Sequence, residues 1–453
     1  MGILTSALLY MLTLTKNDEL SLCLSHTFSH NNPSSLSLYI FIPSEVDLID
    51  GLFSEKNFYY ASISSTKRYR CLKTDLPLLN SHLLMDGPDH ERYRFELSLY
   101  VHQAVSNFKI EHQSIISDLK SNKFEYEKIA LFSTKLLDSI NAIRRQIPKN
   151  QTNLNHFKST DLYLSWFAEQ VFLSIAARLG CKGASEIKKM LLECCQVESQ
   201  YRADQGYGLY RDKNRKANKM KLAELILQRS ITLKEVHVVL GSNLDRISKG
   251  VVTAIMMSLV SLAVILIRNE STVNTTVTFI TLMAALYALR DMFKDDLRKK
   301  VRRFIGRNQA RWRNYYYDPN SNLHLLTQHE NIEFIDIKNL PKEVLKRINC
   351  NNYQETIIHF KSSIIAKRHF PLQSAYTQIA EDIYLNLELF ARHVPRRTQT
   401  LYEVNNGNVV KYSVEKQSVI NVIALDSRTS LVKKWRVTLS AFQVVKIENI
   451  DEK

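Results

Sequence analysis

The chain has 453 residues, enough for two or three domains, and a formal net charge of +16 at pH 7. Hydrophobic residues make up 45% of it and charged residues 23%, which excludes a chain that is disordered along its whole length. Glycine and proline are scarce, at 11 and 9, which argues against glycine-rich phosphate loops and turn-rich repeats. The 6 cysteines form no C-x-x-C pair, which favours reduced thiols over disulfides or a zinc site.

Residues 1–105 are predicted to form a β-rich N-terminal part. Short apolar runs and alternating patterns predict strands near residues 20–28, 35–43, 57–64 and 94–101. Alternation is clearest in FELSLYV, where Phe95, Leu97 and Leu99 would share one face of a strand. A mixed domain is therefore expected, in which strands come first and helices follow.

Residues 106–249 are predicted to form a helical part. Apolar residues recur at three- and four-residue spacings over 128–147, 159–180 and 185–203. This spacing places the apolar side chains on one face of a helix, which can then pack against a neighbour. The pattern from 219 onward predicts a helix that leads into the apolar region.

Two uncharged runs then follow each other closely. The first is GVVTAIMMSLVSLAVILI at 250–267, and the second is TTVTFITLMAALYAL at 275–289. A membrane span needs about 20 apolar residues, and a pair of helices satisfies its backbone polar groups internally. These runs predict a two-helix transmembrane hairpin over 250–289. The alternative is a pair of buried core helices in a soluble protein.

The charges around the apolar runs predict an orientation. Basic residues precede the first run and follow the second, whereas the connector holds Arg268 against Glu270. Positively charged flanks stay on the cytoplasmic side. We therefore expect a multi-pass protein of the inner membrane with both termini in the cytoplasm. The interior of the runs contains no Asp, Glu, His, Lys or Arg, which argues against a proton-coupled transporter.

Residues 290–318 are predicted to form a basic juxtamembrane helix. From Arg290 to Arg313 there are ten Lys or Arg and three Asp, a net charge of 10 − 3 = +7. Such a helix can lie against anionic lipid headgroups or pack on the protein's own domains. The residues expected to anchor it to the bilayer are Arg290, Lys294, Arg298, Lys299, Lys300, Arg302, Arg303 and Arg307.

Nucleic acid is an alternative partner for the end of this segment. Arg311, Trp312 and Arg313 place an aromatic ring between two cations, and three tyrosines follow them. Aromatic rings can stack on bases while arginines contact phosphates. The same residue types also suit a membrane interface, so both interpretations remain open.

Residues 319–453 are predicted to form an α+β domain. Strands are expected at 331–337, 355–365, 418–425 and 434–450, a short helix at 341–348 and a longer helix at 374–394. Asn406 and Gly407 predict the turn of a β-hairpin, because Asn-Gly favours the tight turns that join two strands. The predicted class of the whole chain is α+β, with a transmembrane hairpin between two cytoplasmic domains.

The second half of the chain resembles a group of uncharacterised bacterial two-span membrane proteins. The resemblance covers roughly residues 280–450, and Gln443 departs from it where a glycine is expected. It rests on Tyr287, Arg290, Asp291 and Lys294 after the second run, and on Leu401, Tyr402, Trp435, Arg436, Val437, Leu439, Lys446, Ile447 and Glu448 near the end. It implies an architecture and no particular activity.

No sequence motif indicates a chemistry. The chain lacks the phosphate-binding loop, the dinucleotide fingerprint, the nucleophile elbow and the H-E-x-x-H zinc motif, so no cofactor, metal or catalytic residue is predicted. Glu333, Asp336 and Lys338 match a nuclease core only loosely. Alternating surface charges explain them as well.

The sequence therefore favours a non-catalytic, membrane-tethered sensor-effector or regulatory binding protein, of the kind used in bacterial stress responses or phage defence. A homo-oligomer or a protein partner is expected. The alternatives are a membrane-anchored scaffold that recruits a cytoplasmic protein and a membrane-anchored enzyme that processes nucleic acid.

Overall fold

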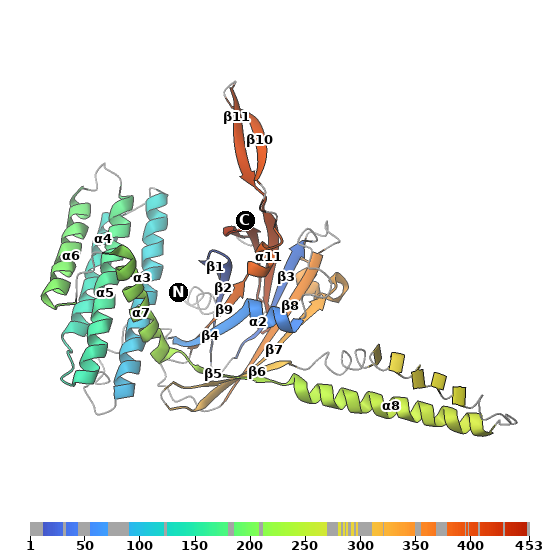
Figure 1. The fold of residues 1–453 in the computed structure, drawn as a ribbon. Coiled ribbons are helices and arrows are strands. Elements are labelled where there is room, and N and C mark those ends of the chain that lie inside the picture. The colour runs from blue at the N-terminus through green and yellow to red at the C-terminus, as the bar shows by residue number, and fades with distance from the viewer. Residues whose placement is uncertain are drawn as a thin grey trace.

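The structure is a computed structural model of the whole chain. It describes residues 12–29, 33–43, 55–70, 90–121, 125–179, 185–207, 212–269, 310–319, 321–348, 355–367, 378–394, 396, 398–405, 408–428 and 431–450, together with 280–281, 284–285, 287–288, 291–293 and 296–297. The fold is α+β and is built from two β-sheets, a helical bundle and two projecting elements (Figure 1).

All described strand pairings are antiparallel. The smaller sheet has the order β1 (Thr13–Asp18), β2 (Ser21–Ser29), β9 (Gln378–Asn386), β4 (Ile63–Arg70). The larger sheet has the order β14 (Val444–Asn449), β13 (Leu431–Leu439), β12 (Ser418–Asp426), β3 (Ser35–Pro43), β8 (Glu355–Ala366), β7 (His324–Ile335), β6 (Trp312–Tyr317), β5 (Lys234–Val239).

Segments from opposite ends of the chain alternate within both sheets. β3 lies between β12 and β8, and β9 lies between β2 and β4. The first 70 residues and the last 130 therefore form one body, although they are separated by the helical bundle in sequence. Neither set of strands can complete its sheet without the other.

The two sheets pack face to face and touch at both edges. Their inner faces share one apolar cluster, to which Leu24 and Ile383 contribute from one sheet and Leu38 and Phe360 from the other. At one edge the backbone N–H of Leu233 donates to the carbonyl of Lys67 over 2.9 Å. At the opposite edge the N–H of Val444 donates to the carbonyl of Glu19 over 2.7 Å. These contacts fix the sheets relative to each other.

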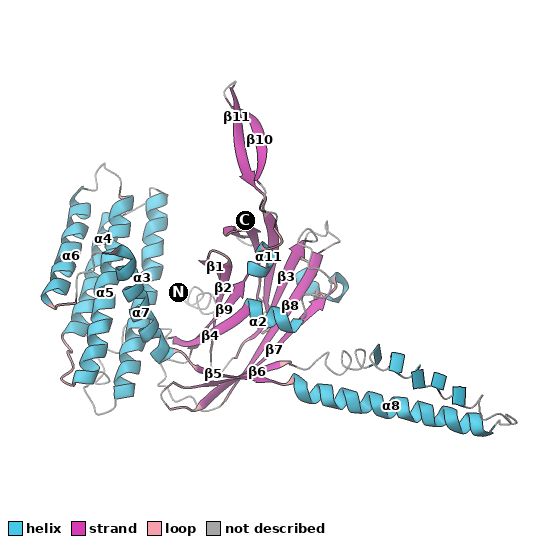
Figure 2. Cartoon of the chain, viewed as in Figure 1, coloured by secondary structure: helices cyan, strands magenta, loops and turns pink. Residues whose placement is uncertain are grey.

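Helices form a bundle beside the sheets (Figure 2). Its members are α3 (His90–Lys120), α4 (Tyr126–Arg144), α5 (Gln151–Arg178), α6 (Ser185–Asp204) and α7 (Lys213–Ile231). The bundle and one end of the sheets share an apolar cluster, in which Phe28 and Tyr69 meet Phe95. Short helices complete the body: α2 (Glu55–Ser62), the 3₁₀ turn η4 (Ile337–Asn339), α10 (Lys342–Leu345) and α11 (Glu388–Ala391).

Two elements project from this body (Figure 1). One is α8 (Gly241–Asn269), a single long helix that leaves the sheet directly after β5. The other is the hairpin of β10 (Thr398–Asn405) and β11 (Asn408–Glu415), which forms a two-stranded sheet of its own.

The predicted transmembrane hairpin is wrong. Within the residues that the structure describes, no helix is both long enough and apolar enough to cross a membrane. The first run lies within α8, whose first turns carry the charged residues Arg246 and Lys249. The second run, 275–289, is described only at isolated positions. The predicted location as a multi-pass inner-membrane protein is corrected with it.

Two local predictions also fail for a physical reason. The predicted strand at 94–101 lies inside α3, where every residue from Phe95 to Val101 is buried. The alternation that suggested a strand came from Glu96 and Ser98, which are themselves buried in the bundle. Residues 57–64 likewise belong mainly to α2 rather than to a strand.

The opposite error occurs at the predicted long helix 374–394. Its described part forms β9 and the short α11. Glu381 and Asp382 interrupt an apolar run and imitate a helical pattern, whereas in β9 they point to opposite faces of a sheet.

Several other predictions are confirmed, including strands at 35–43 and 418–425 and the hairpin that pairs Asn405 with Asn408.

The bundle is held internally by a buried ionic network. Arg144 of α4 donates to Asp161 of α5 over 2.8 Å and to both carboxylate oxygens of Glu198 on α6 over 2.9 and 2.8 Å. Tyr201 and Tyr207 each donate a hydroxyl hydrogen to Asp161. One arginine therefore joins three helices.

Arg144→Met should destabilise the protein strongly, because it leaves two carboxylates buried without their cation. Removing one partner of a buried ion pair costs about 3–5 kcal/mol. Chemical denaturation of the full chain measures this loss. Arg145→Met is the matched control, because Arg145 is exposed on the same helix end. Equal losses for the two variants would contradict the role assigned to Arg144.

Candidate functional site

The most unusual feature of the body is a row of polar side chains inside the sheet sandwich. His26 of β2 and Lys67 of β4 both pair with Glu381 of β9, so the three residues lie side by side across the smaller sheet. The Lys67 ammonium is 2.7 Å from Glu381 Oε1, and His26 Nε2 is 3.3 Å from Glu381 Oε2. Lys67 and Glu381 have 0% of their side-chain surface exposed.

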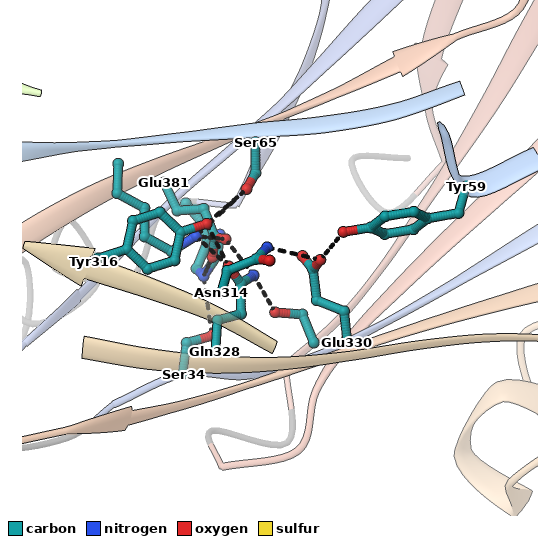
Figure 3. Close-up of polar contacts among 11 residues, drawn as sticks. Ser34, Tyr59, Ser65, Asn314, Tyr316, Gln328, Glu330 and Glu381 are labelled. Atoms are coloured by element: carbon teal, nitrogen blue, oxygen red, sulfur yellow. Dashed lines mark hydrogen bonds and ion pairs between the residues drawn. The ribbon is translucent and has the colours of Figure 1, made fainter. Parts of the chain in front are cut away.

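The larger sheet supplies partners from the opposite side (Figure 3). Lys67 donates to Gln328 Oε1 over 2.6 Å, and the Tyr316 hydroxyl donates to the same oxygen over 2.7 Å. The amide nitrogen of Gln328 donates to Ser362 over 2.8 Å and to Glu381 over 3.0 Å. Gln328 thus connects the ion pair of one sheet to the strands of the other.

The row and its partners from the larger sheet form one polar layer between the two sheets. A second branch of this polar layer surrounds Glu330, which follows Gln328 by two residues on β7. Its carboxylate accepts hydrogen bonds from the Tyr59 hydroxyl and, over 3.1 Å, from the Asn314 amide (Figure 3). Asn314 Oδ1 in turn lies 2.6 Å from His237 Nδ1 on the edge strand β5. Tyr59 stacks on Trp312 with ring centroids 3.9 Å apart. Hydrogen bonds thus link a buried acid to an exposed histidine.

Apolar layers enclose the polar one on both sides. Each residue of the row has apolar neighbours two positions away on its own strand. On the side of the helical bundle these are Phe28, Tyr69 and Ile379. On the opposite side they include Leu24 and Ile383. Strand alternation explains this arrangement, because residues two apart on one strand face the same side. Each polar residue therefore occupies a position where the pattern calls for an apolar one.

Burial and charge set the protonation of the row. Burial is the largest single influence and lowers the pKa of Lys67, but Glu381, Tyr316 and Glu330 together outweigh it, so the net pKa is raised. Burial is the largest single influence and raises the pKa of Glu381, but Lys67, His26 and the hydrogen bond from Gln328 together outweigh it, so the net pKa is lowered. Burial lowers the pKa of His26. The row therefore consists of an ammonium, a carboxylate and a neutral imidazole at neutral pH.

Glu330 is the one acid of this layer that titrates near neutrality. Burial raises its pKa to about 7, although Lys67 and the Tyr59 hydrogen bond act in the opposite direction. Perturbed carboxyl groups of this kind are enriched at functional sites, but they also occur in structural networks. The chemistry available here is uptake or release of one proton inside the sandwich.

In the described parts of the chain, no group of three or more His, Cys, Asp or Glu residues could hold a metal ion. The loose nuclease pattern is not assembled on one strand: Asp336 follows the end of β7, and Lys338 lies in the 3₁₀ turn η4. Within the polar layer, Glu330 is the carboxyl group whose pKa lies near neutrality.

The residues predicted to contact lipid or nucleic acid fall into two groups. The eight basic residues Arg290, Lys294, Arg298, Lys299, Lys300, Arg302, Arg303 and Arg307 lie outside the described residues. Arg311 pairs with Glu55, Trp312 is buried with 1% exposure, and Arg313 donates to His329 over 3.0 Å. The structure thus places these three residues at the start of β6, where they join α2 and β7.

The sequence interpretation missed the polar layer altogether. A signal was present, because Glu381 stands between Ile379 and Ile383, and Glu330 stands two residues before Ile332. A charged residue at an inward position of an alternating strand indicates a buried partner. The partners themselves come from strands distant in sequence, and only the topology brings them together.

Comparison with known proteins gives no relative. No family model, no curated protein and no solved structure matches the chain. The resemblance to two-span membrane proteins stays a prediction that rests on short motifs. Part of its pattern has a local explanation, since Trp435, Val437 and Leu439 are the inward core residues of β13.

Lys67→Met should cost about 3–5 kcal/mol of unfolding free energy, because it leaves Glu381 charged and buried. Combining it with Glu381→Gln should recover a large part of that loss. A double-mutant cycle by chemical denaturation measures the coupling.

Arg68→Met supplies the comparison for Lys67. Arg68 pairs with Asp382 on the outer face of the same two strands, where 14% and 12% of the two side chains are exposed, against 0% for Lys67 and Glu381. A partly hydrated pair contributes less, so its loss should be clearly smaller. Equal losses at Lys67 and Arg68 would show that the inner pair has no special role.

Glu330 should make the protein less stable as pH rises from about 4.5 to about 7. In this window the folded state keeps the proton on Glu330, whereas the unfolded state has released it, so deprotonation favours unfolding. Each pKa unit corresponds to about 1.4 kcal/mol, which gives an effect on the order of 3 kcal/mol. Glu330→Gln should remove it.

Denaturation of wild type and Glu330→Gln between about pH 5 and pH 8 tests this sign. The histidines contribute equally to both proteins, so the difference between them isolates Glu330. Glu333→Gln, on the outer face of the same strand, is the matched control for removal of a carboxyl group from β7. A difference between wild type and Glu330→Gln that is constant with pH would contradict the assignment.

Proposed function

We propose that the protein is a binding protein, a scaffold or regulator, that engages another protein through the β10–β11 hairpin. The observation that carries this proposal is the exposure of large apolar side chains on an element that stands clear of the body (Figure 1). Val404 is 75% exposed, Val409 70% and Tyr402 64%. Exposed apolar patches on an ordered protein are characteristic of interaction sites.

Both faces of the hairpin carry such residues. Tyr402, Val404 and Val409 lie on one face, and Leu401 and Tyr412 pair on the other. The hairpin belongs to neither of the larger sheets. A two-stranded sheet alone is marginally stable in water, because neither face is covered. Packing against a partner would cover these faces and stabilise the two strands.

The body suits the role of a platform. Its two sheets contact each other at both edges, and the polar layer fixes their relative position. A rigid body loses little conformational entropy when an element that projects from it binds a partner. α8 also projects from the body and also exposes apolar side chains, since Ile255, Leu259 and Leu262 are about half exposed along it. Two projecting elements would allow one protein to hold two partners or two parts of one partner.

A site-specific photo-cross-linker at Tyr402 tests the proposal. With the full-length chain in its native cells, it should yield one dominant protein adduct, which mass spectrometry identifies. The identified partner, purified, should bind the wild-type chain. Val404→Thr combined with Val409→Thr should weaken that binding by at least about tenfold, because each change removes buried apolar contact area.

Two controls make this test specific. A cross-linker at Phe442, an exposed aromatic residue of the body, should not give the same adduct. Val419→Thr, an exposed position on β12, should leave the affinity unchanged. Equal adducts at both cross-linker positions, or unchanged affinity of the hairpin variant, would refute binding through the hairpin.

A further inference from the structure

β5 forms one edge of the larger sheet, and each of its six residues is exposed. It pairs with β6 on one side, and among the strands that the structure describes none pairs with its other side. Three of its residues are valines: Val236 is 47% exposed, Val238 38% and Val239 45%. An exposed apolar edge of this kind is a template for pairing with a further strand.

Two hydrogen bonds at the ends of β5 show which way its backbone groups point. At one end the N–H of Leu240 donates to the carbonyl of Arg311, directly before β6, over 3.0 Å. At the other end the N–H of Leu233 donates to the carbonyl of Lys67 in the smaller sheet over 2.9 Å, on the side away from β6. Backbone groups of successive residues in an antiparallel strand point to alternate sides. The even-numbered residues of β5 therefore bond to β6, and the odd-numbered residues point away from it.

The outward backbone groups belong to Glu235, His237 and Val239. In the described part of the chain, no hydrogen bond reaches the backbone N–H or C=O of these three residues. They form a line of three donors and three acceptors along one sheet edge. A second extended strand satisfies such a line, because its own backbone groups repeat at the same interval.

The free part of this edge is complementary to itself. A two-fold axis through His237 places Glu235 opposite Val239 of a second copy, and His237 opposite His237 of that copy. All three outward residues then lie in hydrogen-bonded pairs, which gives about six N–H···O bonds. Sliding the second strand by two residues pairs an outward residue either with Leu233, whose N–H is already bonded, or with Gly241 in α8. The free backbone groups therefore select one register.

The side chains agree with this register. His237 points into the sandwich, where it contacts Asn314, so Val236 and Val238 point to the outer face of the sheet. The axis places Val236 opposite Val238 of the second copy, and four valines from the two copies meet on that face. Pairs of β-branched side chains across neighbouring strands stabilise a sheet. No charged residue of β5 faces a like charge in this arrangement.

We propose that the protein forms a two-fold symmetric dimer in which β5 pairs antiparallel with β5 of a second copy. The two eight-stranded sheets become one continuous sheet across the axis. Each copy offers the same edge to the other, as a closed two-fold interface requires. The β10–β11 hairpin forms a separate sheet and takes no part in the contact, so a dimer carries two hairpins.

Sedimentation equilibrium of the full-length protein tests for the dimer. Wild type should be dimeric at about 50 µM, and Val236→Lys/Val238→Lys should weaken association at least about tenfold, because lysines on an edge strand oppose pairing. Val419→Lys, at an exposed valine of β12, is the matched control and should associate like wild type. Circular dichroism confirms that the variants remain folded. A monomeric wild type at this concentration, or a dimer that the paired lysines do not weaken, refutes the proposal.

Cysteine cross-linking tests the register. Opposed residues in non-hydrogen-bonded pairs of antiparallel strands have Cα atoms about 4.5 Å apart, within the range that a disulfide spans. Val236→Cys chains mixed with Val238→Cys chains should therefore give a covalent dimer of the two variants under mild oxidation. Neither variant alone should form one beyond the level of wild type, which reports the native cysteines. A covalent dimer of Val236→Cys alone, or none in the mixture, contradicts pairing about His237.

Failure of this inference and failure of hairpin binding are distinguishable. Val404→Thr/Val409→Thr should dimerise like wild type, and Val236→Lys/Val238→Lys should still bind the partner identified through Tyr402. Loss of the dimer in the hairpin variant would instead place the contact at the hairpin and overturn pairing through β5.

Discussion

The buried pair of Lys67 and Glu381 is the constraint on which the rest of the body depends. Each charge is expensive to bury alone, so the two strands that carry them must be in register, and Gln328 of the other sheet must lie opposite. A slip of one residue would turn Lys67 outward and place an unpaired carboxylate in the core. Apolar residues alone would tolerate more than one arrangement of two stacked sheets. We infer that the polar layer selects one of them, at a cost in stability.

The polar layer also lies between the two main apolar clusters of the body and extends to the edge strand β5. On one side, the apolar residues of the sheets continue into the helical bundle through Phe28 and Tyr69. On the other side they form the core between the sheets, around Trp312 and Phe360. Glu330, Asn314 and His237 extend the layer to the edge strand β5, from which α8 departs. A change of protonation at Glu330 therefore acts near the base of α8. The β10–β11 hairpin is attached to the body elsewhere, between α11 and β12.

Sequence patterns predicted elements whose signal lies in a short run of residues, and failed where buried polar residues imitated the period of the other kind of element. The strands at 35–43 and 418–425 and the Asn-Gly hairpin were predictable, because periodicity and turn chemistry are local. α3 was not, since Glu96 and Ser98 are buried with their apolar neighbours and produce a false alternation. β9 failed in the reverse sense, because Glu381 is a charge inside a sheet. The apolar runs after residue 250 suggested a membrane hairpin on hydropathy alone. The polar layer could be suspected from single inward charges, but its membership depends on strands more than 200 residues apart.

The position of β3 in the middle of the larger sheet has a consequence for synthesis. β3 is among the first strands to leave the ribosome, yet both of its neighbours, β8 and β12, come from the last 100 residues of the chain. Two hydrogen-bonding edges and the apolar side chains of SLSLYIFIP thus wait unpaired while some 300 residues are made, on the order of 15–60 s at typical elongation rates. The helical bundle, whose contacts are local, can fold during this interval. Until β12 has been made, β3 is accordingly a stretch that would benefit from the cover of a chaperone.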